Sequence, residues 1–512
     1  MGRQDLPDLK RARTLWARDR HDEALELFAR CAREHPKNPY ALTDAARVHG
    51  QWFEFEAMED YVARLLDLSA NRNQNRLQAG MTYRMNYRPQ KAIEHLRPAA
   101  SSKETAFLAA LELAVIYERL GDLEQTQDFA RGALRIVRRS PEATLVLSRA
   151  LNRQGQSDEA QRLLAGISAR PASPISPDTL AAALALRARI HEQRGQYTEA
   201  FSLAEQSNRT LRPLAKHLPP KATDKTDEIT KLFDTLTRRH VEQLLAWSDS
   251  KQRAKVCLMT SYPRSGATLL ESMLGAHPDV VAADELPVFA MRVVQPLVAQ
   301  CGGSPAEAPQ RLLSLSDQWL DEYRTTYLNA HAQTLETTLN GRLLLDKNPS
   351  LTVFLPLFLR LLPEVKLLVP LRDPRDVVLS CFFQYLPVNW VSVSFLDLRS
   401  AAQNFAKLMG HWVGLRRLLP EDSWCEVRYE DLVASPRQEL ARTLEFLGLP
   451  WHADTLSYFE RDKVTVHNAP TYADVKQPPH QKSVGRWENY AEHFVPLRPI
   501  LEPIMNKLGY HW

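Results

Sequence analysis

The stretch Thr260–Leu270, TSYPRSGATLL, combines residue types that bind anions. The apolar run VCLMTSY leads into it and the pattern TLLESMLGAH follows, so we expect a buried strand, a short loop and a helix in that order. Amide groups at a helix start have no partner within the helix and therefore favour an anionic ligand. Gly266 lets the backbone approach such a ligand, and Arg264 supplies a forked cation for phosphate or sulfonate oxygens. The loop is predicted to bind an anion.

A second loop of this kind occurs further along the chain, in KLLVPLRDPRDVVLSCFFQ. It places Arg372 at the end of an apolar strand and Ser380 about two turns into the following helix, on a face that can turn back toward that end. Two anion-directed loops in one sheet indicate a ligand with two separated phosphate-type groups. The first loop lacks the first glycine and the lysine of a Walker A motif, which weakens the case for a kinase.

Four short apolar runs predict the sheet that positions these loops. They are KVCLMTSY, RLLLDK, VKLLVPL and SWCEVRYEDL, and each is typical of a buried strand in a parallel sheet. We therefore expect an α/β domain over residues 251–512, preceded by a Pro- and Lys-rich linker and a helix within residues 213–250. Pro370 lies inside the third run and removes a backbone donor, so this strand is expected to end early or to contain a bulge.

The first two hundred residues contain a repeat with a period of 34 positions. Three positions of each unit keep the phase, namely Ala12, Ala46, Gly80, Ala114 and Ser148; Ala24, Met58, Ala92, Thr126 and Ala160; and Phe28, Val62, Leu96, Ala130 and Leu164. A sixth unit fits at Ala188, Ala200 and Ala204, after the insert RPASPISP. The segment resembles the tetratricopeptide repeat family in a degenerate form. This resemblance implies an all-α superhelix of about six units over residues 1–212, with a surface for a peptide or protein partner; a spacer or dimerisation module is the plainer alternative.

Composition limits the remaining classes. The chain has 512 residues, and 65 Lys and Arg against 61 Asp and Glu give a net charge of +4, so no nucleic-acid partner is indicated. No segment approaches the roughly 18 apolar residues of a membrane span. Five scattered cysteines without a CxxC pair favour a cytoplasmic protein. The histidines lack ligand-like spacing, so no metal is expected.

The two loops and several further segments together resemble sulfotransferases that use 3′-phosphoadenosine 5′-phosphosulfate as donor. The further segments are AHPDVVAADELP, LLLDKNP, VRYEDLVASP, LEFLGLPW and SVGRWENYAEHFVPL. The likeness is to bacterial tetratricopeptide-repeat sulfotransferases and, more distantly, to tyrosylprotein sulfotransferases. It implies that a P-loop-like sulfotransferase domain with a central parallel sheet follows the helical repeats.

By this resemblance, both loops hold the donor. Arg264, Ser265, Gly266, Ala267 and Thr268 would bind the 5′-phosphosulfate, and Arg372 and Ser380 the 3′-phosphate. The family commonly has threonine where this chain has Ala267, so one hydroxyl contact is missing and backbone donors must serve. The segment HQKSVGRWENY would complete the 3′-phosphate pocket through Lys482, Ser483 or Arg486, and Tyr429 would contact the nucleotide.

The resemblance also assigns catalytic roles. Glu285 stands where relatives have their general base, with Asp284 as a competitor, and a base is needed because a neutral hydroxyl is a poor nucleophile. Lys347 and Arg264 would counter the charge of the transferring sulfonate. For Glu285 and Lys347 the plainer alternative is an ordinary surface side chain. The acceptor hydroxyl could belong to a peptide tyrosine, a glycan or a small phenol. The loops YLPVNWVSVSFLDL and VHNAPTYADVKQPP, which mix aromatic and polar residues, are expected to line its entrance. The alternatives are a repeat-based binding protein with an inactive nucleotide domain and, less favoured, a phosphotransferase.

Overall fold

The computed structural model describes residues 6–169, 175–216, 235–246, 253–294, 308–460, 475 and 477–512. The chain divides into two compact units, one up to Pro174 and one that begins at Ile175. We call them the repeat unit and the sheet unit. The linker expected within residues 213–250 and the insert RPASPISP lie partly outside the described residues.

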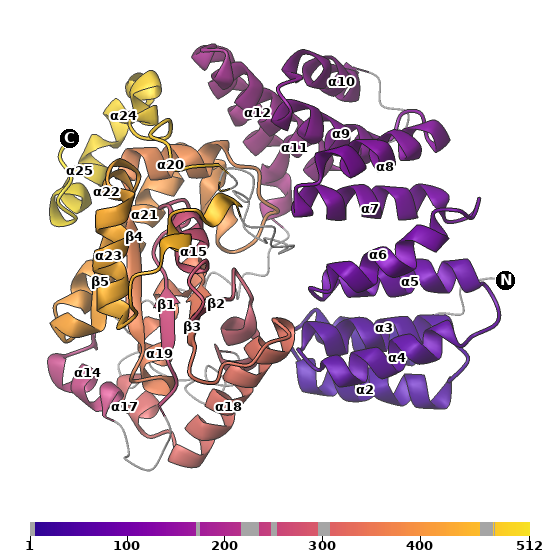
Figure 1. The fold of residues 1–512 in the computed structure, drawn as a ribbon, viewed down its shortest axis with the longest axis horizontal. Coiled ribbons are helices and arrows are strands. Elements are labelled where there is room, and N and C mark those ends of the chain that lie inside the picture. The colour runs from indigo at the N-terminus through magenta and orange to yellow at the C-terminus, as the bar shows by residue number, and fades with distance from the viewer. Residues whose placement is uncertain are drawn as a thin grey trace. The chain divides into compact units, whose positions relative to one another are not determined.

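The repeat unit consists of five successive helix pairs, drawn from indigo to purple in Figure 1. The helices are α1 (Pro7–Trp16), α2 (His21–Glu34), α3 (Pro39–Gln51), α4 (Phe55–Leu66), α5 (Arg72–Met85), α6 (Pro89–Ala99), α7 (Ala106–Leu120), α8 (Leu123–Ile136), α9 (Pro141–Arg153) and α10 (Ser157–Ala169). Several of these helices begin at a residue whose side chain caps the first turn. Asn38 caps α3, Asp122 caps α8 and Ser140 caps α9, each by accepting a backbone N–H of the first turn.

Burial of the repeat positions confirms the period of 34 residues. The predicted phase residues are at most 1% exposed, from Ala12 to Leu164, and Gly80 is buried as well. A Cβ atom on Gly80 would lie 2.5 Å from Cγ of Leu96, so the helices of that pair approach too closely for a side chain. Small residues therefore set the helix spacing, as expected for tetratricopeptide-like pairs.

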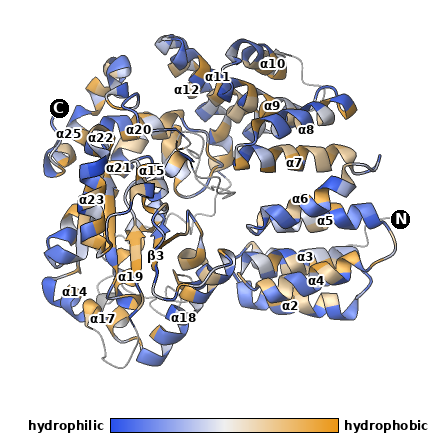
Figure 2. Ribbon diagram, in the orientation of Figure 1, coloured by the Kyte–Doolittle hydropathy of each residue, from blue (hydrophilic) through white to orange (hydrophobic). Residues whose placement is uncertain are grey.

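The sheet unit is built on five parallel strands in the order β2-β3-β1-β4-β5. They are β1 (Val256–Met259), β2 (Val280–Ala282), β3 (Leu343–Lys347), β4 (Lys366–Leu371) and β5 (Trp424–Arg428). Four of them lie in the four predicted apolar runs. Strand β2 was not predicted, because it has three residues and pairs only with β3 at the sheet edge. Figure 2 shows the strands coloured largely as hydrophobic, as expected when helices cover both faces of a sheet.

The helices of the sheet unit begin with the pair that the sequence assigned to a sixth repeat. They are α11 (Pro177–Gln193), α12 (Tyr197–Ala215), α14 (Arg238–Leu245), α15 (Ala267–Leu274), α17 (Ala308–Leu313), α18 (Asp317–Thr334), α19 (Leu355–Leu361), α20 (Pro374–Phe383), α21 (Leu398–Arg416), α22 (Tyr429–Ala434), α23 (Pro436–Leu447), α24 (Ala491–Phe494) and α25 (Arg498–Lys507). In the α11–α12 pair, Ala188, Ala200 and Ala204 are at most 1% exposed, like the other repeat positions. The domain boundary near residue 212 stays a prediction. In the division of the chain into compact units, these two helices belong to the sheet unit.

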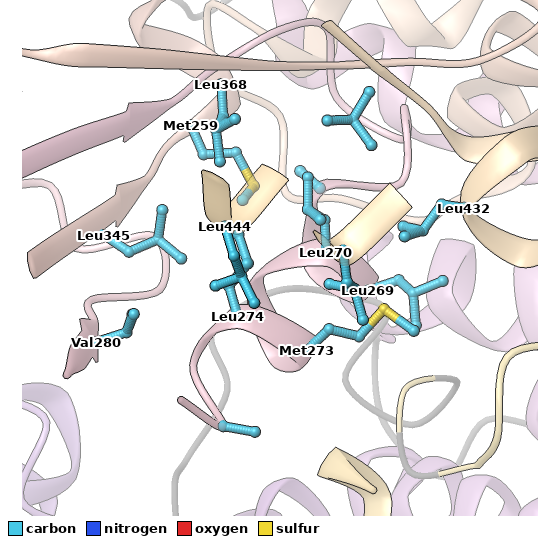
Figure 3. Packing of buried hydrophobic residues seen from close by; sticks show 14 of the residues in the cluster. Met259, Leu269, Leu270, Met273, Leu274, Val280, Leu345, Leu368, Leu432 and Leu444 are labelled. Carbon is cyan, nitrogen blue, oxygen red and sulfur yellow. The ribbon is translucent and has the colours of Figure 1, made fainter. Parts of the chain in front are cut away.

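Helix α15 is fixed against the sheet by buried side chains (Figure 3). Leu270 and Leu274 of this helix belong to one buried cluster with Met259 and Leu345 of the strands and with Leu444 of α23. Each of these residues is buried, and full burial of one such side chain contributes roughly 1.5–3 kcal/mol. The start of α15 is therefore held rigidly at the end of β1.

Pro370 is accommodated in a way that the sequence did not predict. Strand β4 runs on to Leu371, and its register with β5 is unbroken through Pro370, so both the early end and the bulge were wrong. The carbonyl of Leu368 accepts a hydrogen bond from the amide of Thr260, the residue that follows β1. Among the described residues, this is the last backbone hydrogen bond between β4 and the β1 side of the sheet. Residues two apart in a strand point their backbone groups to the same side. The missing donor of Pro370 therefore faces a position where β1 has already ended.

Candidate active site

The carboxyl ends of all five strands carry residues that the sequence analysis singled out. Arg264–Thr268 follow β1, Glu285 follows β2, Lys347 ends β3, Arg372 follows β4 and Tyr429 follows β5. Because the strands are parallel, these ends meet at one edge of the sheet. The chain continues from β1 to β2 and β3 on one side and then to β4 and β5 on the other. In open α/β sheets, ligands generally bind at the strand ends where the order reverses in this way.

A cavity of about 930 Å³ lies at this edge, large enough for a nucleotide and a second substrate. All but two of the predicted site residues line it: Arg264, Gly266, Ala267, Thr268, Glu285, Arg372, Ser380, Tyr429, Lys482, Ser483 and Arg486. The two others, Ser265 and Lys347, are buried beneath its wall with exposed fractions of 2% and 0%.

The loop after β1 takes a left-handed backbone. Arg264 has a φ of 75° and Gly266 a φ of 95°, and Ala267 then begins α15. A left-handed conformation is costly for arginine and tends to mark functional loops. Gly266 is required for a second reason, since a Cβ atom there would lie 2.6 Å from Cδ2 of Tyr429. The loop backbone thus runs close against Tyr429 and presents the first amides of α15 to the cavity.

The two predicted anion loops contact each other. Nε of Arg264 donates a hydrogen bond to Oγ of Ser380 at 2.9 Å, and Nη1 of Arg372 donates to the carbonyl of Arg264 at 3.4 Å. Two guanidinium groups therefore lie on one cavity wall. An ion pair at 3.6 Å between Arg372 and Asp376 offsets part of their charge.

Residues Lys482–Tyr490, which we call the closing segment, are held against the second loop. The carbonyl of Ser483 accepts a hydrogen bond from Arg372. The buried Asp376 carboxylate accepts from the amides of Gly485 at 2.9 Å and Trp487 at 2.8 Å. Burial raises the pKa of Asp376, whereas Arg372 and the two amides oppose this shift.

Trp487 does not line the cavity, and the guanidinium of Arg375 lies 3.8 Å from its ring centroid. Lys482, Ser483 and Arg486 do line it.

The closing segment also contacts residues that the sequence analysis missed. Glu192 of α11 accepts two hydrogen bonds from Arg486, at 2.6 and 2.8 Å, and a third from the hydroxyl of Tyr490 at 3.0 Å. Arg189, Glu192 and Tyr197 line the same cavity. Their position was not predictable, because the repeat pattern assigns α11 and α12 to the helical part of the chain.

A buried lysine and three carboxylates occupy the other end of the site. Nζ of Lys347 lies 2.8 Å from Oδ1 of Asp284, 3.0 Å from Oε1 of Glu285 and 3.3 Å from Oε2 of Glu271. Glu285 is the most exposed of the three carboxylates, with 32% of its side chain accessible, and it lines the cavity. Glu271 also accepts the amide of Asp284 at 2.8 Å, where the backbone has a φ of 51°.

The charges of this cluster are strongly coupled. Burial raises the pKa of Glu271 to about 8 although Lys347 opposes the shift. Burial by itself would lower the pKa of Lys347, but the three carboxylates raise it well above its ordinary value. Lys347 is therefore a buried ammonium group held in place by three acidic side chains. Its contact with Glu285 orients the carboxylate of this cluster that lines the cavity.

Apolar and aromatic side chains line the cavity together with Glu285. Phe354, Trp390 and Phe395 belong to this wall, and the rings of Phe354 and Trp390 meet edge to face with centroids 6.3 Å apart. The loop YLPVNWVSVSFLDL, expected at the acceptor entrance, supplies two of them. The other expected loop, VHNAPTYADVKQPP, lies largely outside the described residues.

Comparison with known proteins matches both parts of the chain to families. A model of the sulfotransferase family matches residues 258–453, and a tetratricopeptide repeat model matches residues 7–30 and 141–165. An uncharacterised protein of Aquifex aeolicus (strain VF5) is 26% identical over 426 residues, which cover 82% of this chain and 53% of that protein. The protein-tyrosine sulfotransferase of Drosophila melanogaster is 26% identical over 328 residues, 57% of this chain and 60% of that protein.

The chain thus spans between half and two thirds of the length of these two relatives. A solved sulfotransferase domain, from the olefin synthase of Synechococcus PCC 7002, is 22% identical over 52% of this chain and 99% of that one, with a TM-score of 0.39. Among the described residues, the helices are too short or too polar to cross a bilayer.

Proposed function

We propose that this chain, which carries a sulfotransferase-family domain behind tetratricopeptide repeats, transfers a sulfonate group from 3′-phosphoadenosine 5′-phosphosulfate to an acceptor hydroxyl. The supporting observation is the arrangement of one cavity. Two arginines, Arg264 and Arg372, lie on one wall with the start of α15, and a carboxylate, Glu285, lines the same cavity. A donor with two anionic groups and a hydroxyl that must lose a proton suit these two parts.

The reaction requires one bond to form and one to break. The acceptor oxygen attacks the sulfur atom, the bond from sulfur to the bridging phosphate oxygen breaks, and 3′-phosphoadenosine 5′-phosphate leaves. Glu285 takes the acceptor proton, and Lys347 holds Glu285 in place from beneath the cavity wall. Arg264 and the amides of Gly266, Ala267 and Thr268 stabilise the charge that develops on the phosphosulfate.

The remaining predicted residues are assigned to the nucleotide. Arg372 and Ser380 bind the 3′-phosphate together with the closing segment, and Tyr429 borders the nucleotide where it contacts the loop after β1. Ala267 lacks the hydroxyl that the family commonly has at this position, so we assign that part of the contact to the amides at the start of α15.

For the acceptor, we propose a phenolic hydroxyl, such as that of a peptide tyrosine. The aromatic wall of Phe354, Trp390 and Phe395 suits a planar ring in the same cavity as Glu285. Relatives of this chain include proteins named protein-tyrosine sulfotransferases. A peptide acceptor also gives the repeat unit a role, because such repeats commonly bind extended partners. We place the reaction in the cytoplasm, where buried thiols such as Cys257 and Cys381 stay reduced.

Calorimetric titration of the full chain with 3′-phosphoadenosine 5′-phosphate tests the donor assignment. Adenosine 5′-phosphate, which lacks the 3′-phosphate, and ATP serve as comparisons. Binding that depends on the 3′-phosphate supports the proposal, and a transfer assay with tyrosine peptides then tests the acceptor. Absence of binding would instead favour a repeat-based binding protein with an inactive domain. Tight Mg²⁺-dependent binding of ATP would favour a phosphotransferase.

A further inference from the structure

The helix pair α11–α12 is joined to the sheet unit by contacts on three elements. Nδ2 of Asn208 donates to the carbonyl of Phe382 in α20 at 2.9 Å, and Asn208 is only 4% exposed. The hydroxyl of Tyr385 donates to Asp178 at 3.0 Å. The ring of Phe201 stacks on His493 of α24 with centroids 3.6 Å apart. A pair of repeat type is therefore built into the unit that carries the cavity.

Arg486 of the closing segment is held in one orientation by this helix pair. Its Nε and Nη2 atoms donate to the two carboxylate oxygens of Glu192, a bidentate geometry that fixes the plane of the guanidinium group. The ring of Phe383 lies beneath, with its centroid 4.8 Å from the guanidinium carbon. Both side chains of the pair are mostly buried, with 20% and 17% accessible, so solvent competes weakly for the contact.

The same segment is attached to the second anion loop through Arg372 and Asp376. Those contacts fix the backbone near Ser483 and Gly485 and do not touch the side chain of Arg486. Glu192 is therefore the partner that sets where the guanidinium of Arg486 lies along the cavity wall. Without it, the arginine side chain would have to be ordered by the ligand, at a cost in affinity.

We propose that Glu192 is a positioning residue for the donor nucleotide, which holds Arg486 ready to bind the 3′-phosphate. The inference rests on the proposed function, because it assumes that the nucleotide is the ligand of the closing segment. It assigns to a helix of the repeat series a part in donor binding. If Glu192 acted only as a negative charge near the phosphates, its removal would strengthen nucleotide binding, so the sign of the effect separates the two roles.

The test compares full-length variants by titration with 3′-phosphoadenosine 5′-phosphate and with adenosine 5′-phosphate. We expect Glu192→Ala to weaken binding of the first ligand about five- to tenfold and to leave binding of the second nearly unchanged. Glu192→Gln, which keeps one acceptor for Arg486, should show a smaller loss. In an Arg486→Ala background, Glu192→Ala should cause no further loss. In transfer assays, KM for the donor should rise while kcat stays constant.

The matched control is Asp178→Ala, which removes another contact of α11 and leaves the Arg486 pair intact. Its ratio of the two affinities should equal that of the wild type. The inference would be overturned if Glu192→Ala weakened binding of both ligands equally, left it unchanged or tightened it. It would also be overturned if Asp178→Ala weakened binding of 3′-phosphoadenosine 5′-phosphate as much as Glu192→Ala does. If the wild-type chain itself fails to bind 3′-phosphoadenosine 5′-phosphate, the proposed function fails, and the two failures are thus distinguishable.

Discussion

Replacing Gly266 by alanine perturbs the loop after β1 in two ways whose size follows from the structure. The left-handed φ of 95° costs a non-glycine residue about 1–2 kcal/mol. The added Cβ atom would lie 2.6 Å from Cδ2 of Tyr429, and overpacking of this kind costs about 1–3 kcal/mol. The sheet unit should therefore lose roughly 2–5 kcal/mol of stability. Because Tyr429 lines the cavity, its displacement should also weaken nucleotide binding.

Urea unfolding followed by tryptophan fluorescence measures the first effect, since most of the ten tryptophans lie in the sheet unit. Calorimetric titration with 3′-phosphoadenosine 5′-phosphate measures the second. Gly410→Ala is the matched control. Gly410 lies inside α21, where a Cβ atom meets nothing within 4 Å, so alanine there should stabilise the chain by about 0.5–1 kcal/mol. Wild-type stability and affinity in Gly266→Ala would refute the reasoning about this loop.

Three further substitutions address the carboxylate cluster. Glu285→Gln should keep nucleotide affinity in calorimetry but lower turnover at least about 100-fold in a transfer assay, and equal turnover would exclude Glu285 as the base. Lys347→Ala leaves the carboxylates of Asp284 and Glu285 without their cation and should cost about 3–5 kcal/mol in urea unfolding at pH 7; an unchanged urea midpoint would show that this ion pairing does not stabilise the fold. The pKa of Glu271 is about 8 in the folded chain against 4.5 in the reference state, so its contribution to stability is present below pH 4.5 and is lost as the pH rises to 8. The stability of Glu271→Gln relative to the wild type should therefore increase between pH 5 and 9 in urea midpoints, and a constant difference would show that Glu271 does not titrate in this window.

The features that the sequence predicted correctly are those with a local or periodic cause. The repeat was visible because close helix approach permits only small side chains at fixed positions, as at Gly80. The strands around β1 and β4 were visible because burial on both faces demands continuous apolar runs. The loops after them were placed at one edge because parallel strands end together.

The features that it missed depend on long-range contacts. The contact between Glu192 and Arg486 joins residues 294 positions apart, and no spacing rule connects them. The burial of Lys347 among three acidic side chains could not be predicted from LLLDKNP, because Glu271 comes from helix α15 and the other two follow strand β2. Pro370 was misjudged because its cost depends on where the neighbouring strand stops, which is a property of the sheet and not of the strand.

Helices α11 and α12 continue the repeat pattern of the sequence, but they belong to the compact unit of the sheet. This double membership limits how the chain can be recombined. A chimera that borrows repeats from another protein has to join them before Ile175 and retain everything after it, because a junction at the end of the repeat pattern would exchange Glu192 together with the helices. The interchangeable part of this protein therefore ends one helix pair earlier than its repeats do.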